Sequence, residues 1–185
     1  MIIKKPATIE DLYRIDGKGE LVNGEVELMA ASGFSPTYAS LQIVKSLEVY
    51  AEQTQKGFAV PDNAGFVVDL PHRQSFSPDA AYFVGEDTGM KFLNGAPLFA
   101  AEVRSEGDYG PFAERKMALK RRDYFAAGTV VVWDVDLQSE DVVRVYRSTA
   151  PESPTIFRRG EFAEAEPATP GWTFPVDKLF RAKKA

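Results

Sequence analysis

The feature that most constrains the fold is a pair of apolar segments joined by a helical one. Residues 97–103 are almost entirely apolar, as expected for a strand buried on both faces, and residues 129–135 (TVVVWDV) are rich in β-branched side chains. Between them, Gly110-Pro111 begins a helical pattern that runs to about Ala127, and Gly128 is placed to end it. This order predicts two parallel neighbours in one sheet, joined by a right-handed crossover helix.

Segments on either side add further strands and helices. The clearest is 20–29 (ELVNGEVELM), where Asn23-Gly24 suits the type I′ turn of a β-hairpin. Apolar residues at helical spacing predict a helix over 36–55. We also expect a short helix capped by Thr8, strands at 66–70, 79–84, 142–147, 155–158 and around Trp172, a loop over 86–95 and a short helix over 176–181. The fold class is therefore α/β (α+β), with a central mixed β-sheet flanked by helices and a single domain over 1–185.

Composition excludes several kinds of active site. The chain has no cysteine, which excludes disulfides, thiolate metal sites and a cysteine nucleophile. A single histidine, His72, cannot build a multi-histidine zinc site within one chain. No segment approaches the roughly 18–20 apolar residues of a membrane span, and the N-terminus lacks the apolar core of a signal peptide. We therefore expect a cytoplasmic protein that makes no membrane contact.

The net charge of −5 disfavours a general nucleic-acid binder, because affinity for phosphate backbones comes from clustered Lys and Arg. A local basic groove stays open as a hypothesis. Its candidates are Arg115, Lys116, Lys120, Arg121 and Arg122 on one helix, Arg158 and Arg159, and Arg181, Lys183 and Lys184 near the C-terminus. The alternative is a solvated helix face and a solubilising tail.

Two carboxylates occupy positions where apolar residues would be the default. Asp79 follows Pro78 and opens one apolar strand, and Glu102 follows the apolar residues 98–101 of another. A carboxylate at the end of a buried strand is costly unless it is paired or bound to a cation. Carboxylate oxygens are the usual ligands of Mg²⁺ and Mn²⁺. The alternative is that each is a strand-end residue that reaches solvent.

A lysine lies on the inward face of the second predicted helix. Lys120 shares a stripe with Ala113, Met117, Tyr124 and Ala127, all otherwise apolar or aromatic. A lysine beside two carboxylates could orient a nucleophilic water and stabilise charge on a phosphate, which suits metal-assisted phosphodiester hydrolysis. The alternative is a snorkelling lysine whose stem packs while its ammonium reaches water.

Other polar groups carry less weight. Glu20, before the hairpin turn, is a candidate third metal-side carboxylate or an ordinary exposed residue at a strand end. Asp108-Tyr109-Gly110 suits a loop over the site and equally a simple turn. We expect Tyr124 and Trp133 to be core aromatics. Gly17-Lys18-Gly19 is too short for a phosphate-binding loop.

Five short motifs together resemble a known family. They are ELVNGE (residues 20–25), SPD (77–79), AEVRS (101–105), KRRDYFAAG (120–128) and VWDV (132–135). A Pro-Asp followed by a strand Glu and a lysine is similar to the PD-(D/E)XK nuclease superfamily. The five motifs, in this order and spacing over residues 8–136, resemble more closely the Uma-two family, described as restriction endonucleases.

The resemblance implies a restriction-endonuclease-like fold and Mg²⁺-dependent cleavage of DNA, with Asp79 and Glu102 as metal ligands and Glu20 assisting. The chain departs from the superfamily pattern at Arg104, which stands where a lysine is usual two positions after Glu102. In that superfamily the neighbouring helix can supply the lysine, and Lys120 fits that role. Arg104 stays protonated and cannot act as a base, but its guanidinium suits a phosphate contact.

The sequence thus predicts a metal-dependent DNA endonuclease with Asp79, Glu102, Lys120 and Arg104 as catalytic residues. Two alternatives stay open. One is a non-catalytic module that binds nucleic acid or protein on the same scaffold, and the other is a hydrolase of smaller phosphate esters. A homodimer is the simplest arrangement for cutting both strands of a duplex.

Overall fold

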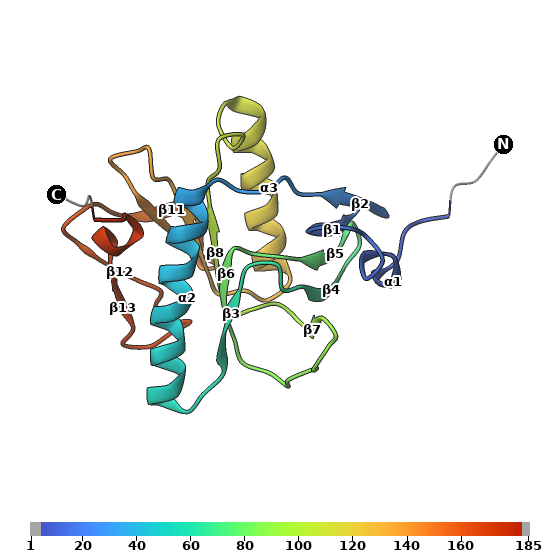
Figure 1. Ribbon diagram of the computed structural model, residues 1–185, viewed down its shortest axis with the longest axis horizontal. Coiled ribbons are helices and arrows are strands. Elements are labelled where there is room, and N and C mark those ends of the chain that lie inside the picture. Colours follow the sequence, from blue (N-terminus) through green and yellow to red (C-terminus); the bar gives the residue numbers. More distant parts are fainter. Residues whose placement is uncertain (1–4, 183–185) are drawn as a thin grey trace.

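A six-stranded mixed sheet forms the centre of the computed structural model, which describes residues 5–182 (Figure 1). Only the β8–β9 pair is parallel, and the other neighbours are antiparallel. The mixed sheet predicted from the sequence is therefore confirmed. In spatial order the strands are β11 (Ala150–Phe157), β10 (Val143–Arg147), β9 (Val131–Val135), β8 (Phe99–Val103), β6 (Ala80–Phe83) and β3 (Phe58–Pro61).

The predicted strand–helix–strand unit lies in the middle of this sheet. β8 and β9 pair in parallel from Phe99 opposite Val131 to Val103 opposite Val135. Helix α3 (Pro111–Ala126) connects them, with Pro111 in its first turn. After the helix, Gly128 takes a φ of +108°, which glycine adopts without steric cost.

Side chains of β8 alternate between two hydrophobic clusters. Phe99, Ala101 and Val103 face a cluster that helix α2 (Phe34–Thr54) covers through its own buried side chains. Ala100 faces a second cluster, which includes Tyr124 of α3. Both faces of β8 are thus covered, and this explains why its sequence is an unbroken apolar run until Glu102.

A second, five-stranded sheet closes the second cluster. The hairpin of its first two strands is confirmed, with a φ of +52° at Asn23 and +74° at Gly24, as a type I′ turn requires. Phe66 and Phe76 supply its largest buried side chains. The strand order is β2 (Glu25–Leu28), β1 (Gly19–Val22), β5 (Arg73–Phe76), β4 (Phe66–Leu70) and β7 (Leu93–Asn94).

Several strands were not predicted, and β5 shows why. Its sequence, RQSF, has no apolar alternation, yet Arg73 and Ser75 are buried. Ser75 accepts a hydrogen bond from the Leu21 amide at 2.8 Å, so a tertiary partner satisfies a polar side chain on a strand that has no apolar pattern. β3 and β12 (Phe162–Glu164) are also additions, and β7 lies within the predicted loop over 86–95.

The C-terminal part packs beside α2. β12 pairs with β13 (Thr173–Pro175), near the predicted Trp172 strand, and the terminal helix is a 3₁₀ turn, η1 (Val176–Leu179). The strand predicted at 155–158 is the end of β11, whose earlier residues include two prolines. β11 lies at the sheet edge, where proline is tolerated. At the N-terminus, Thr8 caps α1 (Ile9–Leu12) through Asp11.

Candidate functional site

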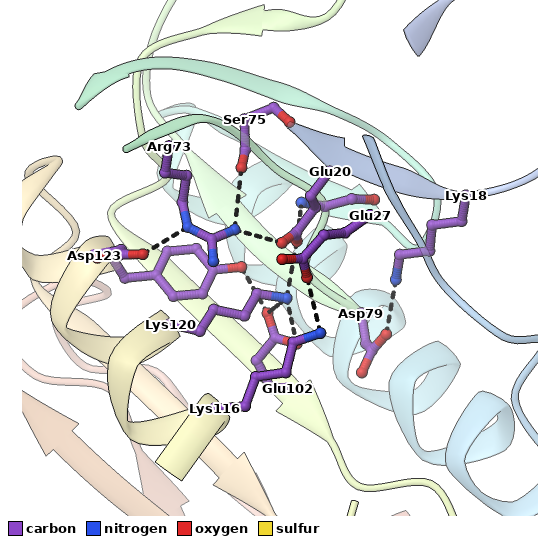
Figure 2. Close-up of polar contacts among 12 residues, drawn as sticks. Lys18, Glu20, Glu27, Arg73, Ser75, Asp79, Glu102, Lys116, Lys120 and Asp123 are labelled. Carbon is purple, nitrogen blue, oxygen red and sulfur yellow. Dashed lines mark hydrogen bonds and ion pairs between the residues drawn. The ribbon is translucent and has the colours of Figure 1, made fainter. Parts of the chain in front are cut away.

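The predicted site residues line one open groove of about 1580 Å³. Glu20 comes from β1, Asp79 from the residue before β6, Glu102 from β8 and Lys120 from α3. Figure 2 shows the side chains of Glu20, Glu102 and Lys120 meeting, while the Asp79 carboxylate is directed at Lys18. The crossover unit explains part of this convergence, because α3 packs back onto the strand that carries Glu102.

Glu102 lies on the same face of β8 as Ala100, and its carboxylate meets α3. Lys120 Nζ lies 2.9 Å from Oε1 and 3.0 Å from Oε2 of Glu102. The hydroxyl of Tyr124 donates to Oε1 at 2.6 Å. Burial raises the pKa of Glu102, although the neighbouring Lys120 acts against this shift. The carboxylate therefore sits in a part-buried, polar pocket, and its side chain is 23% exposed.

Lys120 forms a bridge between two carboxylates. Its Nζ also lies 2.9 Å from Oε1 of Glu20, and the lysine side chain is only 12% exposed. Burial alone would lower the pKa of Lys120, but Glu102 and Glu20 outweigh burial and raise it. The side chain is thus a fixed ammonium group and does not snorkel to water.

Glu20 is the most enclosed of the carboxylates, because the residue is 3% exposed. Arg73 Nη1 donates to Oε2 at 2.6 Å, and the Ser77 amide donates to Oε1 at 2.9 Å. Burial acts to raise the pKa of Glu20, but Lys120 and Arg73 outweigh it and the net shift is downward. Arg73 is held in turn by Asp123, at 2.7 Å.

Asp79 lies on the other side of Glu102. Its backbone amide donates to the Ala101 carbonyl at 3.1 Å, and its Oδ2 accepts from the Val103 amide at 2.8 Å. These two bonds flank Glu102 on the neighbouring strand and place the two carboxylates at the same sheet edge. The other oxygen, Oδ1, pairs with Lys18 at 3.0 Å.

Arg104 belongs to a different set of contacts. Its guanidinium binds Asp134 with two hydrogen bonds of 2.7 Å and also pairs with Glu114 of α3. It also lies over the ring of Tyr109, 5.8 Å from the centroid. Arg104 lines the groove, but its described partners are these groups and not Asp79, Glu102 or Glu20.

Three residues that were not predicted as site residues from the sequence also belong to the site. Arg73 lies on the unpredicted strand β5, and Lys18 was considered only as part of a phosphate loop. Tyr124 is a core aromatic as predicted, stacked on Phe76 at 4.0 Å, but its hydroxyl also contacts Glu102. The sequence does indicate that Lys18 lies near Glu20, since strand alternation puts residues 18 and 20 on one face.

The predicted basic clusters are mostly ion-paired. Lys116 pairs with Glu27 at 2.8 Å and Arg122 with Glu152 at 3.3 Å. Arg158 and Arg159 pair with Asp141 and Asp177, at 2.7 and 2.8 Å. These contacts fit the alternative of a solvated face, while Lys183 and Lys184 lie outside the described residues.

Two carboxylates of the groove, Asp79 and Glu102, are the candidates for holding a metal ion. Among residues 5–182, no group of three or more Asp, Glu or His side chains is arranged to bind an ion. Mg²⁺, however, is commonly held by one or two carboxylates, with waters and substrate phosphates completing its shell. Asp79 and Glu102 fit such a site, and they line the groove.

Charge in this region also favours a cation. The ion pairs of the site join five carboxylates (Glu20, Asp62, Asp79, Glu102 and Asp123) with three cationic side chains (Lys18, Arg73 and Lys120). With these groups ionised and His72, which also contacts Asp123 at 2.7 Å, counted as neutral, a formal excess of two negative charges is left.

The fold is a mixed α+β architecture that a solved structure shares. A solved structure of the same fold, described as "a putative nuclease belonging to DUF820" from Anabaena variabilis ATCC 29413, superposes with a TM-score of 0.71. It is 17% identical in sequence, and the match covers 95% of this chain and 98% of that one.

The chain belongs to the Uma2 family, described as "Putative restriction endonuclease", whose model matches residues 7–177. The family resemblance seen in the sequence motifs is thus confirmed. No curated protein matches the chain. None of the helices within residues 5–182 has the length and apolar character needed to cross a membrane.

Proposed function

We propose that this protein is a metal-dependent endonuclease that hydrolyses phosphodiester bonds in DNA. The observation that carries the proposal is the position of the Lys120 ammonium, 2.9 Å from Glu102, whose chain neighbour Val103 donates its amide to Asp79. Family membership and the nuclease-like fold support this assignment. Mg²⁺ or Mn²⁺ is the proposed cofactor, because both prefer carboxylate oxygens.

In this proposal Asp79 and Glu102 hold the divalent cation. Bound there, the cation would lower the pKa of a water and polarise the scissile phosphate. The raised pKa of Lys120 keeps its ammonium protonated, so it donates hydrogen bonds and stabilises negative charge rather than acting as a base. Tyr124 fixes the orientation of Glu102 by its hydrogen bond to Oε1.

Glu20 and Arg104, the other two predicted site residues, do not contact the metal or the phosphate in this proposal. Both oxygens of Glu20 accept hydrogen bonds or ion pairs, from Arg73, the Ser77 amide and Lys120. Glu20 therefore holds Lys120 in place more readily than it binds a metal. Arg104 is engaged by Asp134 and Glu114, so its predicted phosphate contact would require breaking the buried ion pair with Asp134 or the half-exposed pair with Glu114.

Cleavage of supercoiled and single-stranded DNA tests the proposal. We would compare Mg²⁺, Mn²⁺ and chelator for the wild type, Asp79→Asn, Lys120→Met and Lys116→Met. Lys116 is the matched control, because it lies on the same helix but is 62% exposed and pairs with Glu27. We expect metal-dependent cutting that Asp79→Asn and Lys120→Met lose and Lys116→Met keeps.

Full cutting by Asp79→Asn would overturn the assignment of the metal site. Cutting that survives in Lys120→Met, while Asp79→Asn is inactive, would leave a nuclease but remove the lysine from the mechanism. Activity on a small model phosphodiester, without activity on DNA, would identify a hydrolase of smaller esters. A homodimer that cuts both strands stays a prediction, and sedimentation of the purified protein checks it.

One observation favours a second candidate, a non-catalytic nucleic-acid- or protein-binding module. Arg104, two positions after Glu102, provides no free cationic group, since Asp134 and Glu114 pair with its guanidinium. Titration calorimetry with Mg²⁺ or Mn²⁺ separates the candidates. A nuclease site should bind the ion and lose it in Glu102→Gln, whereas a binding module need not bind it at all.

A further inference from the structure

A second lysine bridges two carboxylates a short way from the first. Lys18 Nζ lies 3.0 Å from Asp79 Oδ1 and 2.6 Å from Asp62 Oδ1, and its side chain is 17% exposed. The residue comes just before β1 and two positions before Glu20. Figure 2 shows its ammonium directed at Asp79, opposite the Lys120 side of the cluster.

Asp79 is held so that one oxygen faces Lys18. Its carbonyl accepts from the Ser40 hydroxyl at 2.6 Å, and its amide donates to Ala101. Its Oδ2 is occupied by the Val103 amide at 2.8 Å. A cation that approaches Asp79 from the groove therefore meets Oδ1, the oxygen that the Lys18 ammonium already contacts.

Asp62 gives this ammonium a second anchor. Asp62 follows β3, and its side chain is 40% exposed at the edge of the groove. A lysine ammonium is a compact charge on a flexible stem, so it can leave one carboxylate and keep the other. Burial acts to lower the pKa of Lys18, but Asp79, Glu102 and Asp62 outweigh it and raise the pKa.

We propose that Lys18 is a built-in counter-ion of Asp79 that competes with the divalent cation for Oδ1. When displaced, the ammonium stays tethered at Asp62, on the wall of the groove, and pairs there with a phosphate of the nucleic acid. This inference rests on the metal site of the proposed function and adds a residue to it. Asp79 thereby links the metal site to the phosphate site.

Linkage then predicts reciprocal effects of metal and nucleic acid. If the cation releases Lys18 toward phosphate, the cation tightens nucleic-acid binding and nucleic acid tightens cation binding by the same factor. In the absence of nucleic acid, Lys18 should hold the affinity for the cation down. Removal of its charge should therefore strengthen binding of the ion alone.

Calorimetric titration with Mg²⁺ alone, and then with Mn²⁺ alone, tests the competition. We would use the wild type, Lys18→Met, Lys116→Met and Asp79→Asn. Methionine keeps an apolar stem of similar length, and thermal unfolding of each variant checks that it is folded. We expect about tenfold tighter binding by Lys18→Met, equivalent to about 1.4 kcal/mol, and no change in Lys116→Met.

The wild-type protein offers a second measurement that does not depend on a variant folding. The ¹⁵Nζ signal of Lys18 should shift on titration with Mg²⁺, and the shift should be absent in Asp79→Asn. One outcome would overturn this inference and leave the nuclease proposal standing. In it, metal binding depends on Asp79, but the metal does not shift the Lys18 signal and Lys18→Met binds the metal with wild-type affinity. An absence of Asp79-dependent binding in the wild type and in Lys18→Met would overturn both.

Discussion

Lys120 and Glu20, a hundred positions apart in the chain, meet across 2.9 Å in a pocket where the glutamate is 3% exposed. The contact joins α3 to the hairpin of the five-stranded sheet, while the same ammonium also holds Glu102 on the six-stranded sheet. The Lys120 ammonium therefore contacts carboxylates of both sheets at the groove. The proposed function and the stability of the protein therefore depend on the same contact.

Substitution Lys120→Met should destabilise the protein as well as inactivate it. It leaves Glu20 and Glu102 without their shared partner in a buried site, and breaking such a pair typically costs about 3–5 kcal/mol. Arg73 still compensates Glu20, so we expect about 1–3 kcal/mol, measured by urea denaturation at pH 7. Lys116→Met on the same helix should change the free energy of unfolding by less than about 1 kcal/mol.

Substitution Tyr124→Phe should reduce activity without disturbing the core. The ring stacks on Phe76 at 4.0 Å and keeps that contact, while the hydrogen bond to Glu102 is lost. We expect a fall of roughly tenfold in the cleavage rate and a loss of about 1–2 kcal/mol in unfolding free energy. Tyr50→Phe is the control, because the Tyr50 hydroxyl donates to the Pro170 carbonyl at 3.2 Å. An unchanged rate in Tyr124→Phe would remove the hydroxyl from the mechanism.

Arg104 and Asp134 should behave as a coupled structural pair. Their two parallel hydrogen bonds lie in a buried site, where both side chains are about 5% exposed or less. Arg104→Met should cost about 3–5 kcal/mol, whereas the double variant with Asp134→Leu should recover much of that loss. A double-mutant cycle on the free energy of unfolding measures the coupling. If Arg104→Met loses cleavage but keeps its stability, the predicted contact of Arg104 with a phosphate would be supported instead.

Glu114 should make stability depend on pH. The hydrogen bond from Arg104 lowers the pKa of Glu114 from its ordinary value of 4.5. A carboxylate with a lowered folded-state pKa stabilises the protein above pH 4.5, and this contribution is lost as the pH falls through the lowered pKa. In urea denaturation, the wild type should therefore be more stable than Glu114→Gln at pH 7, and the difference in unfolding free energy should shrink as the pH falls below 4.5. A constant difference across this range would contradict the ion pair.

The sequence by itself determined the elements whose residues repeat with a clear period. The crossover unit of β8, α3 and β9 followed from two apolar runs and the glycines around the helix, and the β1–β2 hairpin followed from Asn23-Gly24. The same patterns placed Glu102 and Lys120 on facing surfaces, because strand and helix periods fix where side chains point. Local geometry was enough for these predictions.

Only the tertiary structure decided which charges meet. β5 has no apolar alternation, so Arg73 could not be assigned to the site until Glu20 and Asp123 were seen to hold it. Arg104 and Lys18 show the same limit, because an ion pair depends on the position of a partner far away in the chain. The physical reason is that burial of a charge is favourable only with its partner in place, and periodicity carries no information about that partner.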